Sequence, residues 1–156
     1  MKTGVAIGLA VAAFAVIQGA DAAPKKGVPM APEDIVSARH AAMMMSSSAF
    51  GALKAQTNAE DLKRANFPAH ALAHWAKAIP AMFPNGTNIA PTEALPAAWS
   101  DRAGFDAAAQ SFVTATDAVT KAVAANDKTA YAAALDQVGK ACSACHDKYR
   151  KAEEKH

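Results

Sequence analysis

The chain has 156 residues and a formal net charge of +2 at neutral pH. So small a charge, without a patch that combines aromatic and basic residues, gives no indication of nucleic-acid binding. Nothing in the chain resembles a catalytic nucleophile, a general base or a phosphate-binding loop, so we do not expect an enzyme that turns over a substrate.

The first 22 residues have the pattern of a secretory signal peptide. Lys2 gives a positive start, an apolar run covers residues 4–17, and residues 20–22 offer small side chains at a cleavage site. We expect cleavage after Ala22, which leaves residues 23–156 as one domain large enough for a single core. The apolar run is too short for a membrane span, so the expected location is a bacterial periplasm.

Two helices are predicted in the first half of this domain. After a short lead-in at 23–31, proline and acidic residues in a first turn favour a helix over 32–55. Asn58 is a plausible N-cap for a second helix that reaches about residue 82. Pro68 lies inside this second segment and predicts a kink or a local break there.

The second half is predicted to hold a long loop and two further helices. The loop, residues 83–96, is long enough to be functional or to wrap a ligand. Ser100 or Asp101 caps a third helix, which ends at a turn over 126–127, and the fourth helix ends within 151–155. No segment shows the alternation typical of strands. The predicted fold class is therefore all-α, an antiparallel four-helix bundle.

The fourth predicted helix carries the sequence Cys-Ser-Ala-Cys-His at residues 142–146, which is the pattern of a c-type haem attachment site. In that chemistry two thiols add to the haem vinyl groups as thioethers, and the adjacent imidazole binds iron. Positions three and four apart share a helix face, so Cys142, Cys145 and His146 point the same way. Gly139, one turn earlier, would let a flat macrocycle lie close to the backbone.

Other metal and redox interpretations are weaker. A redox dithiol of this spacing is expected beside a βαβ pattern, and a zinc site needs four ligands; neither is present in the sequence. A helical protein with a Cys-x-x-Cys switch and no haem is the remaining alternative. His70 and His74 have a spacing that could chelate a metal, but no third ligand appears in the sequence, and a solvated or core-edge pair is the favoured interpretation.

The chain resembles the cytochrome c-prime family, the class II c-type cytochromes. Residues 138–150 are similar to the family's haem helix almost residue by residue, and residues 31–34 and 99–101 are similar to the starts of its first and third helices. Class I cytochromes carry the same five residues near the N-terminus instead. The resemblance implies a four-helix bundle with the haem near the C-terminus.

The resemblance also implies roles for eight positions. Cys142 and Cys145 would hold one haem c per chain, and His146 would be the proximal iron ligand. The other five would surround the haem, namely Arg39 at a propionate, His40 beside it, Met43 on the distal face, Glu93 at the haem edge and Arg150 beside the proximal pocket.

Function then depends on Met43, the first of three consecutive methionines. If its sulfur binds iron, as in the low-spin c-556-type relatives, the resemblance implies single-electron transfer with periplasmic redox partners. If Met43 only covers the iron, it implies a five-coordinate high-spin protein that binds nitric oxide or carbon monoxide. We expect the first outcome. Relatives that pair through their first two helices make a homodimer a further expectation.

Overall fold

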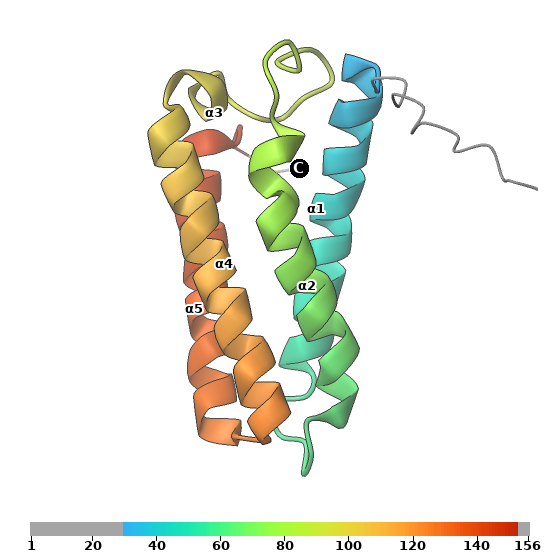
Figure 1. The fold of residues 1–156 in the computed structure, drawn as a ribbon, viewed down its shortest axis with the longest axis vertical. Coiled ribbons are helices and arrows are strands. Elements are labelled where there is room, and N and C mark those ends of the chain that lie inside the picture. Colours follow the sequence, from blue (N-terminus) through green and yellow to red (C-terminus); the bar gives the residue numbers. More distant parts are fainter. Residues whose placement is uncertain (1–29, 153–156) are drawn as a thin grey trace, which may run out of the picture.

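The computed structural model describes residues 30–152, so the expected signal peptide lies outside the described part. Four long helices run side by side along the long axis and alternate in direction (Figure 1). Between residues 30 and 152 there is no strand, only one isolated β-bridge, and the prediction of an all-α four-helix bundle is confirmed. The long helices are α1 (Pro32–Lys54), α2 (Asn66–Ala78), α4 (Arg102–Ala125) and α5 (Lys128–Tyr149); the short ones are η1 (Lys63–Ala65), η2 (Ile79–Met82) and α3 (Ala97–Ser100).

Small residues let the central helices pack closely. Alanines occupy buried positions on the facing sides of α2, α4 and α5, and a short side chain allows two backbones to approach. Larger side chains fill the ends of the bundle, and the Tyr131 hydroxyl donates a hydrogen bond to the Leu53 carbonyl at 2.7 Å. That bond ties the beginning of α5 to the end of α1. Elsewhere these two helices make few close approaches.

The prediction of a second helix over residues 58–82 is wrong at its start, whereas its predicted end near residue 82 coincides with the end of the 3-10 helix η2. The helix begins at Asn66, and the preceding chain instead docks on the turn between α4 and α5. There Leu62 is fully buried and its amide donates to the Asn126 side chain at 2.9 Å. Pro68 therefore falls in the first turn of α2, where its missing N–H is not needed, and no kink is required. After Ala78 the chain tightens into η2, because Pro80 cannot donate the next α-helical hydrogen bond.

The last two long helices begin as predicted, but α5 ends earlier. Asp101 caps α4 by accepting from the Gly104 amide, and Asn126 ends it in a left-handed conformation, φ 51°. The predicted end of α5 within 151–155 is wrong, because the chain becomes extended at Arg150 and pairs with the long loop. The amide of Leu95 donates to the Tyr149 carbonyl, and that of Lys151 to the Glu93 carbonyl, each at 2.8 Å. The loop over residues 83–96 thereby crosses the end of the bundle at which α5 stops (Figure 1).

Gly104 provides a test of the packing at this end. A Cβ atom there would collide with the Asp101 carboxylate and would lie 2.6 Å from the Tyr149 hydroxyl. We expect Gly104→Ala to lower the free energy of unfolding by about 1–3 kcal/mol, as overpacking usually does, in denaturant titration of the holoprotein. Gly51→Ala on α1 is the matched control, since nothing lies within 4 Å of its added Cβ. The control should be neutral or stabilising, and equal losses in both variants would contradict the prediction.

Candidate functional site

The haem motif places its three functional side chains toward the interior of the bundle. Cys142, Cys145 and His146 are half-buried on α5 and line the same cavity. Val138 and Tyr149, on the same side of the helix, are buried, and this fixes the orientation of that face. The spacing argument for a shared face is therefore confirmed.

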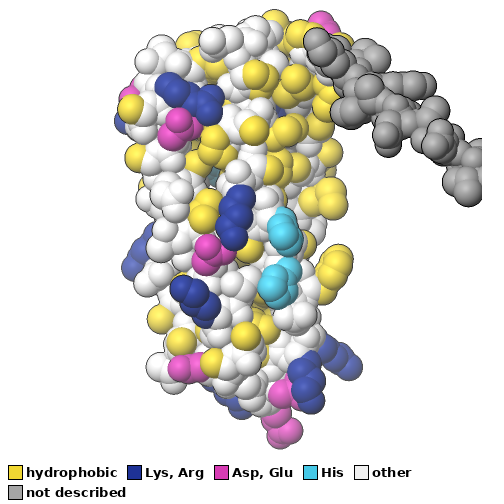
Figure 2. Space-filling view, viewed as in Figure 1, with side chains coloured by type: hydrophobic (Ala, Val, Ile, Leu, Met, Phe, Trp, Pro, Cys, Tyr) yellow, Lys and Arg dark blue, Asp and Glu magenta, His cyan; other side chains and the backbone are white. Residues whose placement is uncertain are grey.

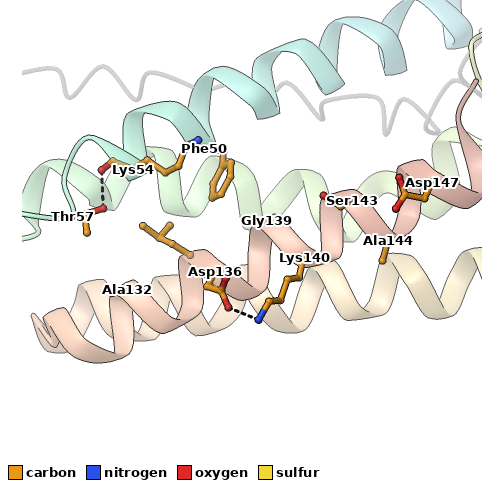
Figure 3. Close-up of a pocket in the computed structure, with 11 residues that line it drawn as sticks. Phe50, Lys54, Thr57, Ala132, Asp136, Gly139, Lys140, Ser143, Ala144 and Asp147 are labelled. Carbon is orange, nitrogen blue, oxygen red and sulfur yellow. Dashed lines mark hydrogen bonds and ion pairs between the residues drawn. The ribbon is translucent and has the colours of Figure 1, made fainter. Parts of the chain in front are cut away.

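The intervening motif residues face the other way, into an open groove between α1 and α5. Figure 3 shows Ser143 and Ala144 on the α5 side of this groove and Phe50 projecting from α1 toward α5. Gly139 lies opposite Phe50, and a Cβ there would be 3.7 Å from the ring, an ordinary contact. This groove therefore lies between α1 and α5, on a different side of α5 from the cavity that the cysteines line.

Two adjoining cavities lie on the inner side of α5. The larger has a volume of about 450 Å³ and the smaller about 180 Å³. The larger volume falls in the range of about 300–1,000 Å³ that is typical of sites for cofactors and other small molecules, and the smaller cavity adjoins it. Both cavities are lined by five shared residues: Met43, Ser47, Ile79, Cys145 and His146.

The two cavities differ in polarity. The larger is bordered by the predicted residues Arg39, His40, Glu93 and Arg150, all near the end crossed by the long loop. The smaller is lined mainly by apolar and aromatic side chains: Phe50, Leu72, Trp75, Ala108, Ala109, Phe112 and Ala141. A site that is charged at one end and apolar at the other fits haem, whose macrocycle is apolar and whose two carboxylates lie at one edge.

Arg39 is the most unusual charged residue of the site, because its side chain is only 4% exposed. Its terminal nitrogens donate to the Thr87 hydroxyl and carbonyl, each at 2.8 Å, and to the Thr92 hydroxyl at 2.7 Å. The guanidinium also lies over the rings of Phe83, at 4.6 Å, and Trp99, at 5.2 Å. Burial lowers the pKa of Arg39 from its ordinary value.

This cation has no ionic partner among residues 30–152, where every ion pair involves other basic side chains. A buried charge without a counterion is costly. An anionic group in the larger cavity beside Arg39 would offset that cost, which is a second reason that the site fits a group with carboxylates.

The hydrogen bonds of Arg39 predict a large effect of a conservative substitution. Arg39→Lys keeps the charge but cannot reproduce two planar donors, so we expect a loss of about 1.5–3 kcal/mol in unfolding free energy. Arg64→Lys, at an exposed position of η1, is the matched control and should stay within about 0.5 kcal/mol. Denaturant titration of both variants checks this, and an Arg39→Lys protein as stable as the control would refute it.

The surroundings of the two thiols do not favour a redox switch. Burial raises the pKa of Cys142, and burial followed by the neighbouring Cys142 charge raises the pKa of Cys145. Reactive dithiols need a lowered pKa, since the thiolate is the nucleophile. Between residues 30 and 152, no group of three or more His, Cys, Asp or Glu residues could hold a metal ion, which also disfavours a zinc site there.

One cluster of polar residues beside the site was not predicted from the sequence. The Asp101 carboxylate accepts from Lys148 Nζ at 2.7 Å, from the Tyr149 hydroxyl at 2.9 Å and from the Gly104 amide at 3.2 Å. The hydrogen bond from Lys148, then those from Tyr149 and Gly104, lower the pKa of Asp101. These contacts attach α5, one turn beyond His146, to the start of α4. The sequence feature that could have indicated the cluster is Tyr149, which lies three residues after His146 on the same helix face.

The three consecutive methionines have different surroundings. Met43 is half-buried against the core and lines both cavities. Met44 reaches only the larger cavity and is 63% exposed, whereas Met45 is 71% exposed. Met43 is thus the methionine that shares both cavities with His146.

Comparisons with known proteins agree with this site. The model of the family described as Cytochrome C' matches residues 34–150. A cytochrome c' of Pararhodospirillum photometricum is 35% identical over 126 residues, which cover 76% of this chain and 98% of that protein. The crystal structure of a cytochrome c' from Rubrivivax gelatinosus superposes with a TM-score of 0.72 and 34% identity, covering 77% of this chain and 97% of that one.

A further similar structure is the nitric oxide complex of a cytochrome c prime variant from Alcaligenes xylosoxidans. It has a TM-score of 0.70 and 32% identity, and the match covers 78% of this chain and 97% of that chain. The family model spans most of the chain, and the cysteines that its haem c requires lie together at the cavity. The chain belongs to the cytochrome c' family.

Proposed function

We propose that this monohaem c-type cytochrome carries single electrons, with iron held between His146 and Met43. The observation that supports the proposal most directly is that Met43, unlike Met44 and Met45, lies inside the bundle at both cavities lined by His146. Haem supplies the redox chemistry, since its iron accepts and releases one electron. Methionine as an iron ligand would favour the reduced state and raise the potential.

The chain's own residues would bind, orient and shield that group. Cys142 and Cys145 would hold it covalently, while Arg39 would compensate the negative charge at one edge. The apolar walls of the smaller cavity would exclude water from the haem, and a dry, fixed environment keeps the reorganisation that accompanies a change of charge small. The Asp101–Tyr149 hydrogen bond would help to hold the end of α5, and with it His146, in place.

The optical spectrum of the reduced holoprotein, recorded before and after addition of carbon monoxide, tests the proposal. A sharp low-spin spectrum that does not change with the gas is the expected result. A high-spin spectrum that shifts promptly with carbon monoxide would overturn the assignment of Met43 as a ligand.

Gas binding is the second candidate function, and a specific observation favours it. If Met43 lies beside His146 without binding iron, the iron keeps an open coordination position that a diatomic molecule could take. The similar protein from Alcaligenes xylosoxidans is described as a nitric oxide complex. Under this alternative Met43 would only cover the distal face.

We further propose that the protein works in the periplasm and meets its redox partners there. Support comes from the signal-peptide pattern in residues 1–22, which lie outside the described part of the chain. Within residues 30–152, no helix has the length and apolar character that crossing a membrane requires. Mass spectrometry of the exported protein would test cleavage after Ala22, and an uncleaved N-terminus would contradict it.

A homodimer through α1 and α2 is the last part of the proposal. These helices expose three large apolar side chains, and Phe67 at the start of α2 is the most exposed of them, at 83%. Contiguous apolar surface, rather than a single exposed side chain, marks protein interfaces, and we propose that these three side chains contribute to one such surface. We expect Phe67→Asp to shift the holoprotein toward the monomer in analytical ultracentrifugation, whereas Ala132→Asp, exposed on α5, should leave the dimer intact. An unchanged dimer in the Phe67 variant would exclude this surface.

A further inference from the structure

Two histidines on α2 line neither of the two cavities of the haem site. His70 and His74 are both exposed and belong to one continuous α-helix, Asn66–Ala78. Residues four apart on a helix lie on the same face, with Cβ atoms about 5–6 Å apart. Figure 2 shows histidine side chains gathered next to each other on the face where α2 lies.

We propose that His70 and His74 form a surface site for one divalent transition-metal ion. Two imidazoles at this spacing bind a single metal in other helical sites, where the helix holds both rings at the same ion. Here the buried neighbours Ala69, Leu72 and Ala73 fix the rotation of α2 in the bundle. Both imidazoles are therefore presented to solvent without any rearrangement of the fold.

The charged side chains near His70 and His74 do not prevent a cation from binding there. Lys77, the nearest basic residue along the helix, has its Nζ 3.1 Å from the Asp117 carboxylate of α4. Its charge is thus drawn toward α4 and partly neutralised. Water molecules would complete the coordination, because no group of three potential ligand side chains exists in the described part of the chain.

Two imidazoles and water select for particular metals. Imidazole ligands suit copper, zinc and nickel, and for a given site the affinity is highest for Cu²⁺ among the divalent first-row ions. Hard cations such as Mg²⁺ prefer oxygen ligands and should not bind. The site would accordingly take Cu²⁺ first and exchange it readily with solvent, unlike the covalently held haem.

Calorimetric titration of the ferric holoprotein with copper sulfate, with glycine as a weak competitor, tests this assignment. We expect one site per chain that His74→Ala weakens by roughly 100-fold, because losing one of two linked ligands forfeits the gain from chelation. His40, His156 and the N-terminus are present in every variant, so their contribution to copper binding is constant.

A rescue variant separates chelation from a general effect of mutation. His70→Ala combined with Ala78→His rebuilds the same spacing one turn later, at an exposed position of α2, and should restore the affinity. Magnesium sulfate should give no binding heat. The assignment is overturned if His74→Ala binds copper as tightly as the parent protein, or if the rescue variant binds no better than His74→Ala.

Discussion

Replacing Cys142 and Cys145 together by serine should release all of the haem from the protein on acid–acetone extraction. The chain has only these two cysteines, and both line the inner cavities, so no other thiol can form a thioether. The measurement is the distribution of haem absorbance between the protein pellet and the organic phase. We expect complete retention in the pellet for the parent protein and complete loss for the double variant.

The single variants and a neighbouring control make this result specific. Cys142→Ser and Cys145→Ser each leave one thiol, so each should still retain haem covalently through a single bond. Ser143→Ala changes an exposed residue that faces the outer groove and should behave like the parent. Haem that stayed with the double variant after extraction would show that its attachment does not depend on these thioethers.

The success of the motif prediction has a local cause. Cys142, Cys145 and His146 lie within five residues of one helix, and the helical repeat alone decides that they share a face. The start of α4 at Asp101 is local in the same way, because the capping carboxylate and the Gly104 amide that donates a hydrogen bond to it are three residues apart. Features of this kind can be predicted from sequence without knowing the fold.

The misplaced start of the second helix has a non-local cause. Asn58, Glu60 and Asp61 look like a helix start, but the burial of Leu62 and its hydrogen bond to Asn126 hold this segment against a turn far away in the chain. A tertiary contact of this kind overrides local propensity. The early end of α5 is similar, since its last residues pair with residues 93–95 of the long loop.

The residues that border the site could be predicted from the sequence, but the contacts that hold them in place could not. All eight predicted positions border one or both cavities, which supports the resemblance that suggested them without testing their roles. The contribution of Thr87 and Thr92 was not foreseeable, because these hydroxyls meet Arg39 only after the loop folds back over α1. The Asp101 carboxylate, likewise, reaches Tyr149 across forty-eight positions of sequence.

Met43→Leu should convert the iron from low-spin to high-spin and make the reduced protein bind carbon monoxide. Leucine has nearly the volume of methionine, so packing changes little and the expected loss of stability is below about 1.5 kcal/mol. It has no sulfur, however, and cannot bind iron. The change therefore isolates coordination from packing, which a truncation to alanine would not do.

Spectra and redox titration of the holoprotein measure the outcome, with Met44→Leu as the matched control. Met44 is adjacent in the chain but 63% exposed, so its replacement should leave spin state, gas binding and reduction potential unchanged. For Met43→Leu the potential should fall, because the ligand that favours ferrous iron is gone. If the parent protein is already high-spin and Met43→Leu leaves it so, Met43 only covers the distal face, and gas binding becomes the better account of what this cytochrome does.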